Sequence, residues 1–303
     1  MKLNTDICSI IAKNIYDPKY ELIEGIDLNN LPFITLSTNS NAIDVLIDNL
    51  DKVDWVFLSA NKNPKAIELL SKNIDKINWN FISYNPSAIK LISENLDKIN
   101  WNLLSKNPSA VHILINNQDK INWEMLSQNP NAIELLDKNQ DKIDWSYLSN
   151  NDNAISILRK NKDKINWNII SLYCKDKIFL KENIIYLNFK NLSLNPSAID
   201  ILKENQDKID WDNLSENYAA IDLLKENFNK INWKHLSANS SAIDLLKENK
   251  DKINQTYLKF NSSIEVLKLM TEFDWCHISC LEDIFIIKDK TKLIHKTLDI
   301  ILT

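Results

Sequence analysis

Glycine is almost absent from this chain of 303 residues, in which Gly25 is the only one. Loops that bind phosphate groups need glycine so that the backbone can approach the anion closely, and no nucleotide-binding fingerprint can be written with a single glycine. The tight turns of β-sandwiches and β-barrels also depend on glycine. The sequence therefore disfavours nucleotide-binding enzymes and turn-rich β folds.

Cysteine is scarce as well, with four residues (Cys8, Cys174, Cys276 and Cys280) at irregular spacings. This usage fits a reducing compartment better than a disulfide framework. The chain also lacks an apolar run long enough to span a bilayer and a clear signal-peptide layout at its N-terminus. We expect an intracellular protein that is neither secreted nor transmembrane.

A basic excess is the third feature that is missing. The 36 basic and 41 acidic side chains give a net charge of −5 and are well mixed along the chain. Broad binding to a phosphate backbone requires a clear positive excess. Nucleic acid is therefore disfavoured as the main partner, although a local basic row is not excluded by the total charge.

Tryptophan, by contrast, is abundant and periodic. The nine tryptophans are Trp55, Trp79, Trp101, Trp123, Trp145, Trp167, Trp211, Trp233 and Trp275. Most neighbours are 22 residues apart, and Phe189 stands midway across the one gap of 44 residues. A fixed period of this length indicates tandem structural repeats that stack on one another.

The repeated unit predicts two short helices. With tryptophan as position 1, it reads W-x-x-L-S-x-N-P-x-A-I-x-L-L-x-x-N-x-D-K-I-N, as in residues 101–122. The Asn-Pro step is typical of a helix start, because asparagine caps free N–H groups and proline suits the first helical position. In the unit from Phe189, we expect Asn205 to end this helix in a left-handed conformation and Asp207 to cap the next helix. A leucine-rich repeat fits less well, because the residue two before the repeated leucine is polar where a strand needs an apolar one.

The predicted fold is an all-α α-solenoid of about twelve two-helix repeats with capping ends. Residues 1–32 form the expected N-terminal cap, residues 33–275 the tandem repeats and residues 276–303 a C-terminal capping helix region, all in one continuous solenoid. Residues 167–188 are a degenerate unit that lacks the Asn-Pro, Ala-Ile and Asp-Lys steps. The repeated tryptophans are expected to form the structural core: Trp55, Trp79, Trp101, Trp123, Trp145, Trp167, Trp211 and Trp233.

A lysine recurs at position 20 of nearly every unit. The members of this row are Lys52, Lys76, Lys98, Lys120, Lys142, Lys164, Lys208, Lys230 and Lys252. Stacked units would align these lysines along one ridge that could follow a nucleic-acid backbone. An aspartate precedes nearly every one of them, however, and a lysine can lie with its stem on apolar surface. A nucleic-acid-binding solenoid is therefore the alternative function rather than the first one.

Catalytic and metal-binding patterns find little support. The four histidines (His112, His235, His277 and His295) lie in different units, without a recognisable nucleophile motif. The cluster of Cys276, His277 and Cys280, with His295 as a fourth candidate, matches no standard zinc spacing. We expect no enzymatic activity, no cofactor and no metal, with an enzyme of unknown class as a second alternative.

The exposed helix positions differ between the two halves of the chain. After Leu194 they repeat Asp, Lys and Glu almost unchanged, whereas they vary in the earlier units and include stray apolar residues. Varied, partly apolar surface is typical of an interaction site, so we expect a protein partner to bind the half around residues 44–160. The candidate residues are Ile47, Tyr84, Lys90, Lys106, His112, Ile115 and Gln128. Recent duplication of the C-terminal units would also explain the contrast.

The unit NPSAIxLLxENxDKINWxxLS resembles a tandem repeat of proteins from mimivirus-like giant DNA viruses. The resemblance covers roughly residues 33–275, and the chain's richness in Ile, Asn and Lys agrees with that origin. It implies helical repeats and protein interaction, and it brings no catalytic residues. We therefore expect a non-enzymatic scaffold that binds a protein partner over an extended surface, in a virus–host setting and, if the protein is viral, in the host cytoplasm. The identity of the partner and the oligomeric state are not determined by the sequence.

Overall fold

The computed structural model describes residues 20–22, 27–263, 265, 269–270 and 285–287. Most of the predicted N-terminal cap, most of the predicted C-terminal capping region and Trp275 lie outside these residues. The Cys276, His277, Cys280 and His295 group lies outside them as well. Contacts divide the chain into unit 1, residues 1–78 and 274–303, and unit 2, residues 79–273.

The prediction of two short helices per repeat is confirmed. In residues 101–122, α8 (Trp101–Lys106) carries the tryptophan, the 3-10 turn η5 (Pro108–Ala110) leads into α9 (Val111–Ile115), and η6 (Gln118–Lys120) closes the repeat. The first helices of the pairs are α2 (Phe33–Leu36), α4 (Trp55–Leu58), α6 (Trp79–Tyr84), α8, α10 (Trp123–Ser127), α12 (Trp145–Leu148), α14 (Trp167–Tyr173), α16 (Phe189–Leu192), α18 (Trp211–Glu216), α20 (Trp233–Ser237) and α22 (Gln255–Leu258). The second helices are α3 (Ile43–Ile47), α5 (Pro64–Ser71), α7 (Ile89–Ser93), α9, α11 (Ile133–Asp137), α13 (Ile155–Lys160), α15 (Lys177–Glu182), α17 (Ile199–Glu204), α19 (Ile221–Glu226) and α21 (Ile243–Glu248).

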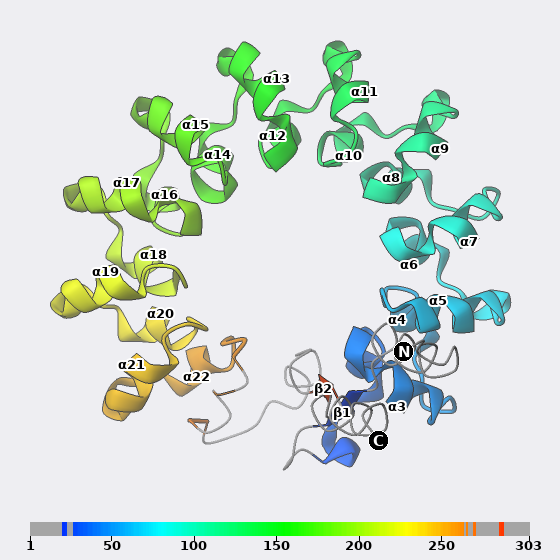
Figure 1. The fold of residues 1–303 in the computed structure, drawn as a ribbon, viewed down its shortest axis with the longest axis horizontal. Helices are drawn as coiled ribbons and strands as arrows, with labels where there is room; N and C mark the ends of the chain where they lie inside the picture. Colours follow the sequence, from blue (N-terminus) through cyan, green and yellow to red (C-terminus); the bar gives the residue numbers. More distant parts are fainter. Residues whose placement is uncertain (1–19, 23–26, 264, 266–268, 271–284, 288–303) are drawn as a thin grey trace, which may run out of the picture. The chain divides into compact units, whose positions relative to one another are not determined.

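Within unit 2 the two kinds of helix form two rows, as Figure 1 shows. The first helices, α6 to α22, make an inner row, and the second helices, α7 to α21, make an outer row. Neighbouring inner helices contact each other, for example α6 with α8 and α18 with α20. This helical architecture with neighbour-to-neighbour contacts is consistent with an α-solenoid.

Two short strands lie in unit 1. Strand β1 (Tyr20–Leu22) pairs antiparallel with β2 (Phe285–Ile287), with Glu21 opposite Ile286. Residues 285–287 belong to the segment predicted as a capping helix region, so that prediction is wrong for these three residues. The pairing also joins a segment before the first repeat to a segment after the last one.

The fully buried apolar core consists mainly of aliphatic side chains, with Phe179 as an aromatic member. In residues 101–122 it contains Leu104, Ala110 and Leu114, each with 0% exposure. The predicted tryptophan core is wrong in this respect, because every repeated tryptophan in the described residues is only half-buried. Leucine at position 4, not tryptophan at position 1, points to the centre of the stack. The tryptophan lies at its margin, where the ammonium of a lysine from the same repeat lies over the ring, as Lys120 does over Trp101.

A ladder of buried asparagines joins one repeat to the next. Asn107 at position 7 is fully buried, and its side-chain amide donates to the carbonyls of Ser83 and Asn85 in the preceding repeat, at 3.0 and 3.2 Å. Its amide oxygen accepts the N–H of Ser109 and so caps the following turn. The same bonds recur at Asn129 and Asn239. Because a buried carbonyl without a partner is costly, these asparagines hold adjacent repeats in register.

The serine at position 5 has an equally constant role. The Ser105 hydroxyl donates to the carbonyl of Trp101 at 2.8 Å and accepts the N–H of Asn122 at 3.0 Å. It therefore ties the start of a repeat to its end. Most of the polar consensus is thus explained by internal hydrogen bonds.

Two predicted caps need correction. Asn205 has φ −135° and ψ 48°, which is not left-handed, and its side chain donates to the carbonyl of Ile201. Asp207 lies inside η12 (Gln206–Lys208), whereas Asp210, directly before Trp211, caps α18 by accepting the N–H of Asn213. The cap lies at position 22 because the residues between the 3-10 turn and the tryptophan are extended.

The degenerate unit 167–188 keeps the two-helix form. Cys174 is 3% exposed and takes the place of the buried ladder asparagine, and its carbonyl accepts from Asn195 at 2.9 Å. Tyr186 replaces the position-20 lysine and stacks on Trp167 with ring centroids 4.9 Å apart. Apolar and aromatic contacts therefore replace the missing consensus steps.

Candidate interaction surface

The exposed side of the inner-row helices carries residues that differ from one repeat to the next. Positions 2, 3 and 6 of the unit share one helix face, because residues three and four apart are neighbours on a helix. Positions 4 and 5 lie on the opposite face and are buried, as Leu104 and Ser105 illustrate. Positions 2, 3 and 6 are therefore free to differ between repeats.

Position 3 is apolar in five consecutive repeats of unit 2. We call these residues the apolar stripe: Phe81, Leu103, Met125, Tyr147 and Ile169. Phe81 is 39% exposed, and the other four are half-buried. Because adjacent inner helices contact each other from α6 to α12, the stripe crosses repeat boundaries.

Charge is depleted around the apolar stripe. Among positions 2, 3 and 6 of residues 79–172, only Lys106 and Glu124 are charged. The Lys106 ammonium lies 5.6 Å from the centroid of the Tyr84 ring. A hydrogen bond to the Glu124 carboxylate raises the pKa of the Tyr147 hydroxyl. Both charges are thus engaged with aromatic side chains of the same surface.

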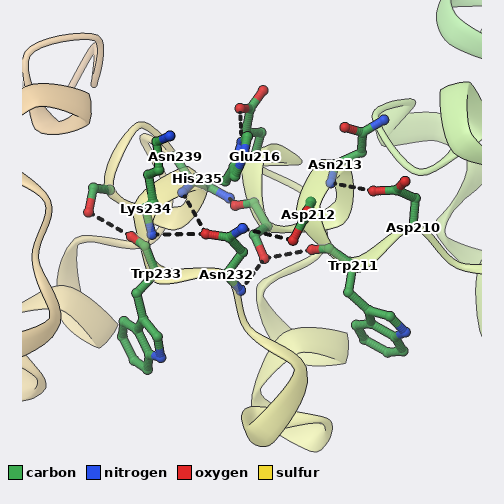
Figure 2. A network of polar contacts seen from close by, with 12 residues as sticks. Asp210, Trp211, Asp212, Asn213, Glu216, Asn232, Trp233, Lys234, His235 and Asn239 are labelled. Carbon is green, nitrogen blue, oxygen red and sulfur yellow. Dashed lines mark hydrogen bonds and ion pairs between the residues drawn. The ribbon is translucent and has the colours of Figure 1, made fainter.

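In the next three repeats position 3 is polar. We call Asn191, Asn213 and His235 the polar stripe. The amides of Asn191 and Asn213 donate to backbone carbonyls of the preceding repeat, at 3.2 and 2.9 Å. His235 pairs through Nδ1 with the carboxylate of Glu216 (Figure 2). Each polar-stripe side chain therefore has its partner within the protein.

A row of amides runs beside both stripes. Where position 22 is an asparagine, its side chain in several repeats donates to position 2 of the same repeat, as Asn232 does to Asp212 at 2.7 Å (Figure 2). The same bond joins Asn122 to Asn102 at 3.3 Å and Asn188 to Asn168 at 3.0 Å. In these bonds Asn102 and Asn168 use their oxygens. Within the described residues their exposed NH2 groups have no hydrogen-bond partner.

The seven residues predicted for partner binding fall into separate groups. Tyr84, Lys106 and Gln128 occupy position 6 of successive inner-row repeats, and Tyr84 and Lys106 contact each other. By contrast, Lys90, His112 and Ile115 are exposed on the outer helices α7 and α9. Ile47 ends α3 in unit 1 and is 39% exposed. The structure thus joins the position-6 residues to the apolar stripe and places the others elsewhere.

The position-3 residues were not recognised as surface from the sequence. Their apolar character is visible in the sequence, but apolar character alone does not distinguish a surface position from one buried between neighbouring helices. The pattern that could have identified them is the change at Asn191, where position 3 becomes polar while Leu192 and Ser193 keep the buried consensus. A position that tolerates asparagine in one repeat and methionine in another is not part of the tight core.

The lysine row lies against aromatic rings. The Lys120 ammonium is 4.5 Å from the centroid of the Trp101 ring, and the Lys230 ammonium is 4.4 Å from that of Trp211. The remaining lysines of the row occupy the same place over the aromatic residue of their own repeat. This cation–π contact gives the recurring lysine a structural role. Figure 2 shows Trp211 and Trp233 pointing away from the His235–Glu216 pair.

A second apolar exposure occurs in the degenerate unit. Ile178 is 67% exposed, beside a shallow cleft of about 420 Å³ between α15 and α17. Two ion pairs of 2.9 Å, Lys177 to Asp200 and Lys181 to Glu204, join the same two helices. These charged side chains next to the cleft are thus paired with each other and link the degenerate unit to the following repeat.

The described residues offer no clear catalytic or metal centre. No group of three or more His, Cys, Asp or Glu residues among them could hold a metal ion. Burial raises the pKa of the Cys174 thiol to about 11, which makes it a poor nucleophile. None of the helices in the described residues is long and apolar enough to cross a membrane.

The fold and surface define a helical repeat protein with an apolar, charge-poor stripe on its inner row. No family model matches the chain. No curated protein and no solved structure matches it either.

Proposed function

We propose that this protein is a non-enzymatic repeat scaffold that binds a protein partner through the apolar stripe of its inner row. The observation that supports this proposal is that five successive repeats carry apolar side chains at position 3 that remain partly exposed, with few charges around them. The proposal includes a stack of about twelve repeats with capping ends, inside the cell and in a virus–host setting, as the repeat resemblance implies.

The composition of the stripe supports a protein partner. Interface cores are depleted in charge and enriched in aromatic residues and methionine. Phe81, Tyr84, Met125 and Tyr147 give this surface that composition. Several moderate contacts over adjacent repeats would add up to one extended interface, in which each repeat contributes a small share of the binding free energy.

Site-specific photo-crosslinking tests the proposal. A photoreactive phenylalanine analogue replaces Tyr147 in the inner row or, as the matched control, His112 in the outer row. The tagged protein is irradiated in lysate of the cells that contain it, with and without nuclease. We expect a discrete protein adduct at position 147 that persists after nuclease treatment and is much weaker at position 112.

Two outcomes would contradict the proposal. Equal adducts at both positions would show that the inner row is not the binding surface. Adducts that disappear with nuclease would point instead to nucleic acid, and binding that weakens steeply with salt would support the lysine row as its site.

A further inference from the structure

The spacing of the apolar stripe restricts the form of its partner. The stripe supplies one apolar side chain per repeat, and packed helices lie about 8–10 Å apart. A polyproline II segment has three residues per turn and rises about 3.1 Å per residue, so one turn advances about 9 Å. Every third side chain of such a segment would therefore meet one repeat of the stripe.

The amide row matches the backbone of the same kind of segment. A polyproline II helix has no internal hydrogen bonds, so its carbonyls need external donors. The NH2 groups of Asn102 and Asn168 are exposed beside the stripe and supply such donors. A folded partner would present few unpaired carbonyls to them, because its backbone groups are already paired.

The charge of the surface restricts the partner's side chains. Lys106 and Glu124 are the only charged residues at positions 2, 3 and 6 of residues 79–172, and they have opposite signs. At the flanking position 22 the same repeats add one carboxylate, Asp144, which accepts the N–H of Tyr147. Complementary electrostatics then requires an uncharged segment, because a charge packed against Met125 or Ile169 would lose water without gaining a partner. The outer face, rich in Asp, Lys and Glu after Leu194, lacks this property.

We infer that the stripe binds an extended, uncharged peptide segment of its partner in the polyproline II conformation, with an apolar side chain at every third residue. This inference rests on the proposed function and specifies its partner. Three residues of peptide correspond to one repeat, and the segment spans the five repeats from Phe81 to Ile169.

Fluorescence anisotropy with synthetic peptides and the full chain tests this inference. The probe is a labelled peptide of five Leu-Pro-Ser triplets. Three peptides of equal length serve as controls: one with leucine at every second residue, one with leucine at every fourth residue, and one with aspartate in place of leucine. We expect the triplet peptide to bind at least about tenfold more tightly than each control.

Two matched variants locate the site. Met125→Glu places a charge in the apolar stripe, and Asn213→Glu places the same charge at the same position of the polar stripe. Met125→Glu should weaken binding of the triplet peptide at least about tenfold, and Asn213→Glu should leave it unchanged, while circular dichroism shows equal helicity for both. No binding of the triplet peptide, equal affinity for all spacings, or equal effects of the two variants would overturn the inference. A protein adduct at position 147 together with such a result would retain the proposed function and reject only the extended peptide.

Discussion

The apolar stripe and the polar stripe occupy the same position of the same repeated helix, but their side chains find partners in different ways. Asn191 and Asn213 donate to the carbonyls of the preceding repeat, and His235 pairs with Glu216. Leu103, Met125 and Ile169 have no polar group to satisfy and remain partly exposed to water. Apolar surface is removed from water only by further packing. The comparison teaches that the same repeated helix carries one surface whose polar groups are paired internally and one apolar surface that remains partly exposed to water.

The buried asparagines should stabilise the repeats with the apolar stripe and the repeats with the polar stripe to the same extent. Replacing the buried Asn129 or the buried Asn239 by alanine removes two donors from carbonyls of the preceding repeats. Each variant should lower the free energy of unfolding by about 2–4 kcal/mol, because buried carbonyls lose their partners. Urea unfolding followed by circular dichroism measures the change. A large effect at Asn129 with almost none at Asn239 would mean that the halves differ in their cores as well as in their surfaces.

The degenerate unit 167–188 lies at the junction of the apolar stripe and the polar stripe, and its contribution to stability should decrease at alkaline pH. Burial raises the pKa of Cys174 from an ordinary value of 9.0 to about 11, so between these values the unfolded chain loses the proton that the folded chain keeps. The stability therefore falls as pH rises through this window, by at most about 2–3 kcal/mol. Urea unfolding at successive pH values measures it. In Cys174→Ala the decrease in unfolding free energy that comes from this thiol should be absent. Identical pH profiles for the two proteins would show that Cys174 does not cause the decrease.

Extending the apolar stripe should extend binding. Asn191→Leu and Asn213→Met together place at position 3 of two polar-stripe repeats the same residues that Leu103 and Met125 provide in the apolar stripe. We expect a longer triplet peptide to gain roughly fivefold to tenfold in affinity, about 1 kcal/mol, from the added apolar burial. Anisotropy titration measures the gain. The original peptide, which already spans its five repeats, serves as the control and should change little.

The smallest effect should come from the lysine row. Lys120→Met in the apolar half and Lys230→Met in the polar half keep the apolar stem and remove the ammonium from above the tryptophan ring. Each should cost about 0.5–1 kcal/mol of unfolding free energy, as expected for an exposed cation–π contact. Thermal and urea unfolding would detect it. If one variant also abolished partner capture, the lysine would have a binding role beyond this contact.

The sequence was sufficient for the repeated two-helix unit, because the period, the Asn-Pro step and the buried leucines are all encoded locally. The tryptophans were misassigned because the largest apolar side chain suggests the deepest burial, whereas Lys120 covers a face of Trp101 that remains outside the core. The caps were misplaced because Asp207 and Asp210 are both plausible, and only the extended backbone between them selects Asp210.

The candidate interaction surface was only partly predictable for a related reason. Tyr84, Lys106 and Gln128 vary in sequence, and the structure places them beside the apolar stripe. Lys90 and His112 vary equally but lie in the outer row. Sequence variation does not reveal whether a variable residue lies in the inner or the outer row of helices, because that depends on how successive repeats stack.

The methionine methyl groups allow the most direct test of the central claim. The chain has three methionines, Met1, Met125 and Met270, and only Met125 lies in the apolar stripe. Protein labelled with ¹³C at the methionine methyl groups gives one signal for each, and Met125→Leu assigns the signal of interest. When the crosslinked partner is added, the account predicts that the Met125 signal shifts or broadens while those of Met1 and Met270 stay in place. A partner that binds and leaves the Met125 signal unchanged would contradict it.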